Sequence, residues 1–261
     1  METDDKQKGV ALVTGSGKRL GLAIANALAD DGWAVVFHAN SSLEVAQSAA
    51  QAVIDRGGLA AAFQADLSDS DALKPLVASA GAAFGPLTLL VNNAGVFEHD
   101  SIRTVTKNTI ATNLNLNLIA PMLLTQAFVA QLPGGVQGNV INILDQRVAN
   151  PTPNFMSYTA SKVALAVMTR TWALELAPAI RVNGIGPGMA LPDPGNDEAG
   201  MKTWTDGYPL RRGTSPEEIS HALRYILSAP AMTGQTLHLD GGQNLGWLHP
   251  EGGYPLKPGQ V

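Results

Sequence analysis

The chain has 261 residues, of which 45% are hydrophobic and 15% are charged, and its formal net charge at pH 7 is -5. This length suits one large α/β domain with a sizeable core. The acidic balance gives no basic field that would attract nucleic acid or an anionic membrane. The chain has no cysteine, which excludes disulfides and thiolate metal sites and fits a reducing compartment. We predict no metal site, no nucleic-acid partner and no membrane partner.

Residues 1–8 form a polar arm that lacks the apolar core of a signal peptide. No apolar run in the chain reaches the length needed to span a bilayer. We find no internal repeat and no linker, so residues 1–261 are predicted to form a single domain. A cytoplasmic location is expected.

Short apolar runs alternate with Ala- and Leu-rich segments of helical period, which is typical of βαβ units and a parallel sheet. Seven strands are predicted, over residues 10–13, 33–37, 59–64, 87–91, 138–144, 180–185 and 235–239. Helices are predicted over residues 20–32, 43–56, 71–84, 104–132, 155–176 and 216–228. We expect a break near Pro121 in the long fourth helix. Ser215 and Glu218 are placed for a capping box at the start of the last helix.

Two segments near the C-terminus, residues 189–212 and 246–261, match neither the helix pattern nor the strand pattern. Residues 189–212 have a mixed period and several Pro and Gly residues, so they are predicted to form a mobile flap over the substrate. Residues 246–261 are a tail rich in Gly and Pro.

A glycine-rich loop, Thr14-Gly-Ser-Gly-Lys-Arg-Leu-Gly21, joins the first strand to the first helix. Glycines at this place let the backbone turn tightly and approach a pyrophosphate, which then sits at the helix N-terminus. An ordinary βα turn could have the same composition, so the position after strand one is what favours dinucleotide binding.

The end of the second strand indicates which dinucleotide is bound. An acid there would bind the ribose 2′-hydroxyl and repel a 2′-phosphate. This chain has His38-Ala-Asn-Ser-Ser42 instead, and Lys18 and Arg19 lie in the neighbouring loop. Cations and hydroxyls without a carboxylate favour NADP(H), although NAD(H) stays possible.

Tyr158 and Lys162 are four residues apart, so in a helix they leave the same face. An ammonium beside a phenol stabilises the phenolate and tunes it for proton transfer. The spacing alone would also fit an ordinary surface turn of helix. Asp145 lies thirteen residues before the tyrosine.

Taken together, these motifs resemble the short-chain dehydrogenase/reductase family from about Gly9 to Gly242. The resemblance also includes Asn92-Asn-Ala-Gly95. It implies an α/β, single-domain, doubly wound (Rossmann) fold with a seven-stranded parallel sheet and a nicotinamide cofactor. It also implies proton transfer by Tyr158, with Lys162 holding the nicotinamide ribose, and a homotetramer whose interfaces use the long helices after strands four and five.

The resemblance assigns further residues by position. Asn117 matches a residue that supports a water chain from the lysine to solvent. The cofactor contacts that it implies, together with those of the loops above, are Gly15, Gly17, Arg19, Leu20, His38, Asn40, Ser41, Asp66, Leu67, Asn93, Ala94, Gly95, Tyr158, Lys162, Pro187 and Gly188.

Two departures from the common family pattern are the most informative. Arg19 stands where most members have Gly, and Asp145 stands where most have a Ser that polarises a substrate carbonyl. A carboxylate would repel a developing oxyanion but could bond the N–H groups of an amino-pyrimidine. The pair resembles the pteridine reductase branch, which has an aromatic ring at Phe97. Against that branch, Ser41 stands where it often has an arginine for the 2′-phosphate.

The residues that this branch implies for the substrate are Arg19, Phe97, Asp145, Tyr158, Met189, Trp204 and Leu210. We therefore expect an NADPH-dependent reductase of a pteridine C=N bond, with Asp145, Tyr158, Lys162 and Asn117 as its catalytic residues. The alternatives are a carbonyl reductase or alcohol dehydrogenase with a protonated Asp145, and a cofactor-binding sensor without turnover. The pteridine prediction requires that Asp145 face the nicotinamide side and that no neighbouring cation lock it.

Overall fold

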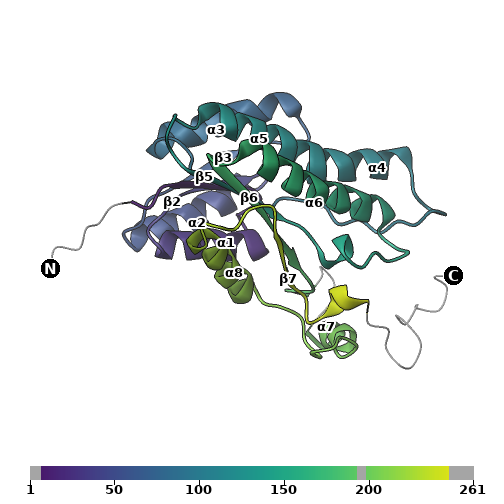
Figure 1. Ribbon diagram of the computed structural model, residues 1–261. Helices are drawn as coiled ribbons and strands as arrows, with labels where there is room; N and C mark the ends of the chain where they lie inside the picture. Colours follow the sequence, from purple (N-terminus) through teal and green to yellow (C-terminus); the bar gives the residue numbers. More distant parts are fainter. Residues whose placement is uncertain (1–6, 193–197, 247–261) are drawn as a thin grey trace.

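The computed structural model describes residues 7–192 and 198–246, and its centre is a parallel sheet of seven strands (Figure 1). The strands are β1 (Val10–Val13), β2 (Ala34–Ala39), β3 (Ala60–Gln64), β4 (Leu89–Asn92), β5 (Gly138–Ile143), β6 (Ile180–Pro187) and β7 (Thr236–Leu239). Their order across the sheet is β3-β2-β1-β4-β5-β6-β7. The order reverses between β1 and β4, which is the point where doubly wound folds bind ligands. The predicted fold class is confirmed.

Helices cover both faces of the sheet (Figure 1). The helices are α1 (Arg19–Asp30), α2 (Leu43–Asp55), α3 (Ser70–Phe84), α4 (Lys107–Leu114), α5 (Ala120–Gln131), α6 (Met156–Leu176), α7 (Glu198–Thr205) and α8 (Pro216–Ser228). One apolar core lies between the sheet and α1, α2 and α8, and the other lies between the sheet and α3, α5 and α6. Because successive strand residues point to opposite faces, Ala11 and Val13 enter the first core while Val10 and Leu12 enter the second.

The break predicted near Pro121 has a definite structure. A single π-helical turn, Asn115–Ile119, separates α4 from α5, and Pro121 lies in the first turn of α5. Proline is tolerated there because the first N–H groups of a helix have no intrahelical acceptor. The π turn contains Asn117, and such turns often accompany functional sites.

Helix α8 begins as the sequence predicts, with one difference. The Ser215 hydroxyl accepts from the backbone N–H of Glu218 at 3.2 Å, which is half of a capping box. The Glu218 carboxylate contacts Arg212 and the Thr214 hydroxyl instead. The carboxylate therefore ties the segment before α8 to the helix.

The predicted flap contains the helix α7. Residues 193–197 of the flap, residues 1–6 of the N-terminal arm and residues 247–261 of the tail lie outside the described residues. Among the helices that are described, none combines the length and the apolar character that crossing a bilayer requires.

Candidate active site

The glycine-rich loop between β1 and α1 is anchored by the neighbouring β4 end. The Thr14 hydroxyl accepts from the backbone N–H groups of Asn93 and Ala94 at 2.9 and 3.0 Å. In return, the Asn93 side chain donates to the Thr14 carbonyl at 2.8 Å. Gly15 has φ +63°, which favours glycine, and a Cβ on Gly21 would clash with the Gly15 carbonyl. The two loops at the switch point are thus held together.

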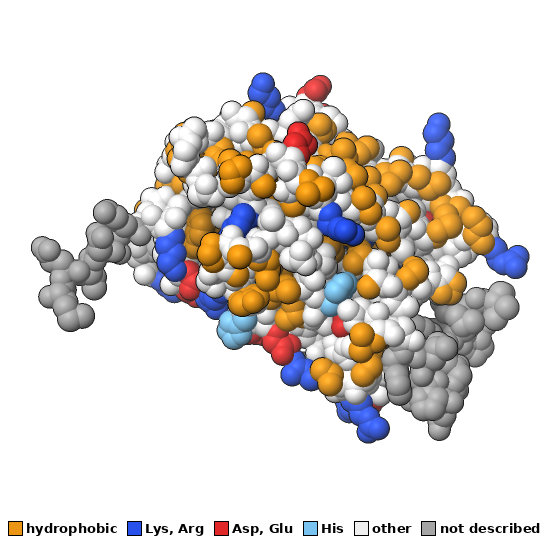
Figure 2. All heavy atoms as spheres, viewed as in Figure 1, with side chains coloured by type: hydrophobic (Ala, Val, Ile, Leu, Met, Phe, Trp, Pro, Cys, Tyr) orange, Lys and Arg blue, Asp and Glu red, His pale blue; other side chains and the backbone are white. Residues whose placement is uncertain are grey.

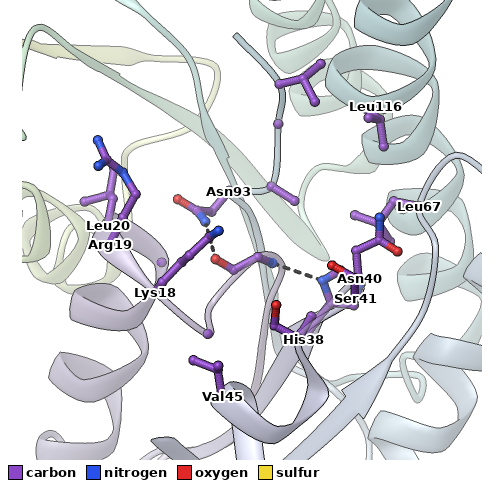
Figure 3. A pocket seen from close by; sticks show the side chains of 18 residues that line it. Lys18, Arg19, Leu20, His38, Asn40, Ser41, Val45, Leu67, Asn93 and Leu116 are labelled. Carbon is purple, nitrogen blue, oxygen red and sulfur yellow. Dashed lines mark hydrogen bonds between the residues drawn. The ribbon is translucent and has the colours of Figure 1, made fainter. Parts of the chain in front are cut away.

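His38 supports this loop from within the sheet (Figure 3). The Gly15 N–H donates to Nδ1 at 3.0 Å, and Nε2 lies 3.0 Å from the Ala65 carbonyl. These two bonds fix Nε2 as the protonated nitrogen. Burial lowers the pKa of His38, against the raising effect of the Ala65 carbonyl. The ring is therefore neutral and braces the loop. It was predicted to contact the cofactor from just beyond a strand that ends at residue 37, whereas β2 continues to Ala39 and includes it.

A cavity of about 420 Å³ opens above the glycine-rich loop (Figure 3). Most of the residues predicted for the cofactor line it: Gly15, Gly17, Arg19, Leu20, His38, Asn40, Ser41, Leu67, Asn93, Ala94 and Gly95. Asp66, beside this lining, accepts from the N–H and hydroxyl of Ser68 at 2.8 and 2.7 Å, and these bonds lower its pKa. Lys18 and Ser42, which also line the cavity, add a cation and a hydroxyl.

The lining fits a dinucleotide on steric grounds as well. A Cβ on Gly95 would lie 2.7 Å from Asn117 Oδ1 and 3.7 Å from Lys162 Nζ. A side chain at residue 95 would therefore intrude between the loop after β4 and the lysine. The bare backbone at Gly15, Gly21 and Gly95 leaves the room that close approach of a pyrophosphate and ribose requires.

Arg19 turns toward the flap. Its guanidinium donates to the Pro192 carbonyl at 3.0 Å, and its own backbone is left-handed with φ 54°. The residue was predicted to reach the pyrophosphate and the substrate. In this structure it lies at the rim of the cavity and links the glycine-rich loop to the first residues of the flap.

Tyr158, Lys162 and Asp145 are brought together by α6 and the end of β5. The Tyr158 hydroxyl donates to Asp145 Oδ2 at 3.0 Å. Lys162 Nζ donates to the Ile143 carbonyl at 2.8 Å and lies 5.8 Å from the centre of the Tyr158 ring. Burial lowers the pKa of Lys162 to about 8, and the charge of Asp145 opposes this shift. The lysine therefore stands close to titration near neutral pH.

Asn117 is fully buried and joins three segments. Its Oδ1 accepts from the Val96 N–H at 2.9 Å, and its Nδ2 donates to the Val96 carbonyl at 3.0 Å. Nδ2 also lies 3.1 Å from the Ser161 hydroxyl and 3.2 Å from Asn113 Oδ1. The π turn thus connects the loop after β4 to the face of α6 that carries Tyr158 and Lys162.

Asp145 faces the tyrosine, but a neighbouring cation also holds it. Oδ1 accepts from the backbone N–H of Arg147 at 2.8 Å and lies 3.3 Å from its Nη1. The side chains of both residues are largely buried, with 15% and 17% exposed. The sequence analysis required that no cation lock this acid, and that condition is not met. The other oxygen, Oδ2, accepts from Tyr158.

An aromatic group forms the rim beside this acid. Phe97 stacks on Phe155 with ring centres 4.1 Å apart, and it meets Tyr158 edge-to-face at 4.7 Å. The Arg147 guanidinium carbon lies 5.2 and 5.0 Å from the centres of Phe97 and Phe155. With Tyr158 and Phe155 also against its ring, Phe97 is still 42% exposed.

The remaining predicted residues lie around the flap. The Gly188 N–H donates to the Leu239 carbonyl at 2.9 Å, and Pro187 ends β6. The carbonyl of Met189 accepts from the Thr214 N–H at 3.1 Å. Trp204 lies in α7, and Leu210 is 70% exposed. None of these residues lines the cavity over the glycine-rich loop.

Arg147 and Phe155 were missed by the sequence analysis. The signal for Arg147 is a basic residue two positions after the acid. Its contact with Asp145 arises only because residues 146–148 form one turn of 3-10 helix that Asp145 caps. Phe155 precedes α6 with a left-handed backbone, φ 59°. No pattern in the sequence predicts a left-handed backbone at this residue.

Known proteins share the fold of this chain and part of its sequence. The family model for short chain dehydrogenase matches residues 9–199. The crystal structure of FolM alternative dihydrofolate reductase 1 from Brucella suis, in complex with NADP, is 38% identical with a TM-score of 0.90, covering 94% of this chain and 98% of that one.

Two curated relatives have other names. An uncharacterised oxidoreductase from Methylorubrum extorquens is 36% identical over 89% of this chain and 96% of its own. A 3-oxoacyl-[acyl-carrier-protein] reductase from Synechocystis is 31% identical over 89% of this chain and 96% of its own.

Proposed function

The chain belongs to the short-chain dehydrogenase family, and from that premise we propose that it is an NADPH-dependent reductase of a pteridine, of the dihydropterin or dihydrofolate type. The observation that carries the proposal is the acceptor oxygen of Asp145, 3.0 Å from the Tyr158 hydroxyl, together with the partly exposed ring of Phe97. The similarity to an alternative dihydrofolate reductase supports the same substrate class.

The cofactor is NADP(H), which the solved Brucella suis relative holds. In this chain the glycine-rich loop, Asn93 and Gly95 would hold its pyrophosphate and riboses. Asn40 and Ser41 follow the end of β2, where a 2′-phosphate would bind, and Lys18 lines the same cavity from the glycine-rich loop. When bound, the reduced nicotinamide supplies a hydride. Every other part of the reaction has to come from the side chains of the protein.

Proton delivery is assigned to Tyr158. Its hydroxyl is the donor in the bond to Asp145, so its proton is directed toward the acid in the resting protein. The Lys162 ammonium, held at the Ile143 carbonyl, stabilises negative charge that develops on the phenol oxygen during transfer. Asn117 keeps the loop after β4 in place against this pair.

Substrate orientation is assigned to Asp145 and Phe97. A carboxylate oxygen only accepts hydrogen bonds, and an amino-pyrimidine edge presents N–H donors. The exposed part of the Phe97 ring would suit contact with a planar heterocycle. Because Arg147 occupies Oδ1, only Oδ2 takes part, and the substrate shares that oxygen with Tyr158.

A carbonyl reductase is the second candidate, and the Arg147 contact favours it. A guanidinium beside Asp145 offsets part of the charge that would repel a developing oxyanion. The Synechocystis relative, 31% identical, is named a 3-oxoacyl-[acyl-carrier-protein] reductase, and this name supports the second candidate.

The experiment is NADPH oxidation with dihydrobiopterin, dihydromonapterin and dihydrofolate, against a panel of simple ketones. We expect turnover of at least one pteridine. The substitution Asp145→Ser then separates the candidates, because it should lower pteridine reduction and hold or raise ketone reduction. Turnover of ketones with none of any pteridine in the wild-type protein would assign the second candidate instead.

We also propose a homotetramer that buries the outer faces of α5 and α6. Hydrophobic side chains gather on the face where these helices lie (Figure 2). Leu174 and Val167 on α6 are 84% and 53% exposed, and contiguous apolar surface of this kind marks interfaces. Light scattering should give the mass of four chains, and Leu174→Glu should reduce it. The cytoplasmic location stays a prediction.

A further inference from the structure

Arg147 touches each of the three segments that meet at the rim of the site. It holds Asp145 at the end of β5, and its guanidinium lies beside Phe97 from the loop after β4 and beside Phe155 from the start of α6. Its Nε also lies 3.4 Å from the Thr152 hydroxyl. Among the described residues, this arginine is the cation paired with Asp145.

We propose that Arg147 is a positioning residue that commits one oxygen of Asp145 to itself and thereby presents the other to Tyr158 and the substrate. The inference rests on the proposed roles of Asp145 and Tyr158, and it does not depend on whether the substrate is a pteridine or a ketone.

The burial of Arg147 and Asp145 strengthens the ion pair between them. An exposed arginine–aspartate pair contributes little because water screens it, but both of these side chains are more than four-fifths covered. Removing one partner leaves the other as a poorly compensated charge. Without the Arg147 side chain, Oδ1 of Asp145 keeps only its bond to the backbone N–H, so the carboxylate can rotate and turn Oδ2 away from Tyr158.

The ring contacts extend the same role to the aromatic rim. A guanidinium within about 6 Å of a ring centre is attracted to the ring, and Arg147 is within this distance of two rings. Arg147 therefore holds the rings of Phe97 and Phe155 in a fixed position relative to the Asp145 carboxylate. The arrangement makes the aspartate and the aromatic stack one unit, so a change at Arg147 should act through Asp145.

A double-mutant cycle tests this coupling, using whichever substrate the wild-type protein turns over best. We expect Arg147→Met to lower kcat about tenfold, the usual size for one hydrogen bond to a charged group, with the Kd for NADPH unchanged by fluorescence. Arg147→Lys should recover part of the loss because it keeps the charge. The double variant Asp145→Asn with Arg147→Met should lose no more than Asp145→Asn alone.

Arg224→Met is the matched control, because it removes an arginine from another ion pair, with Asp31 at 2.7 Å, away from the site. It should leave kcat unchanged. Additive losses in the double variant, an unchanged kcat in Arg147→Met, or an equal loss in Arg224→Met would each overturn the proposal.

A crystal structure of the Arg147→Met protein without ligands gives a readout that needs no turnover. The Asp145 carboxylate should leave the Tyr158 hydroxyl, and a bond still near 3.0 Å would count against Arg147. Should the Met variant not fold, the Arg147→Lys protein serves in the same way, with a lengthened bond expected. A wild-type protein that turns over no substrate would sink the proposed function alone, and the crystal structures would still decide the role of Arg147.

Discussion

The two sides of Tyr158 are built in different ways. On the buried side, Asn113, Asn117 and Ser161 are fully covered, and Lys162 is only 5% exposed. These groups bond main-chain atoms or one another. On the rim side, Asp145 is held by side chains from nearby turns, and Phe97 is 42% exposed. The buried side is part of the fold itself, whereas the rim can change without unfolding it. We infer that the first sets the chemistry and the second the choice of substrate.

The largest effect is expected on the buried side, at Lys162. Lys162→Met removes the ammonium that stabilises charge on the Tyr158 oxygen, and kcat should fall about 10³-fold, in the range of lost acid–base catalysis. Steady-state kinetics with saturating NADPH would measure it. Lys74→Met, on the exposed face of α3, is the control and should keep full activity. If kcat of Lys162→Met fell by less than tenfold, the proposed role of Lys162 in stabilising the Tyr158 oxygen would be wrong.

The same substitution has a consequence for stability against pH. Burial lowers the pKa of Lys162 from 10.5 to about 8 in the folded protein, so the unfolded chain binds the proton more tightly between these values. The stability of the wild-type protein relative to Lys162→Met should therefore rise as the pH rises from about 8 to about 10.5, by up to about 3 kcal/mol. Urea unfolding of both proteins across this range measures the difference. A difference that falls with pH would contradict the buried ammonium.

An intermediate effect is expected at Asn117. Asn117→Ala removes both bonds to the Val96 backbone and leaves buried groups without partners, which costs about 1–3 kcal/mol of stability. The loop after β4 should shift, and kcat should fall about 30-fold, a loss of about 2 kcal/mol in the barrier. Asn113→Ala is the matched variant, because it disturbs the same network but leaves Val96 held. It should retain more activity than Asn117→Ala. Equal losses would mean that the network as a whole matters rather than the contact with Val96.

The sequence indicated the buried side better than the rim. The Tyr158–Lys162 spacing, the glycine-rich loop and the break before Pro121 follow from helix period, turn chemistry and the missing N–H of proline, all of which are local. The Asp145–Arg147 pair depends on one turn of 3-10 helix, and its ring contacts depend on residues 97 and 155 from other segments. Likewise, β2 runs two residues further than predicted, to Ala39, and only this extension shows that His38 also bonds the glycine-rich loop from within the sheet. Local patterns do not fix such details.

The smallest effect, and the most direct probe of the rim, is expected at Phe97. Phe97→Leu keeps an apolar side chain but removes the flat ring, and an aromatic pair contributes about 0.5–1.5 kcal/mol beyond its buried area. The KM for a pteridine should therefore rise about threefold to tenfold, while kcat and the Kd for NADPH stay within about twofold. The KM for an aliphatic ketone should not change, because such a substrate gains nothing from stacking. Phe84→Leu, at the end of α3, should leave both KM values alone. Equal rises for pteridine and ketone would show that Phe97 shapes the cleft without recognising a ring, and the contrast between a fixed chemical side and a selective rim would then rest on Asp145 and Arg147 alone.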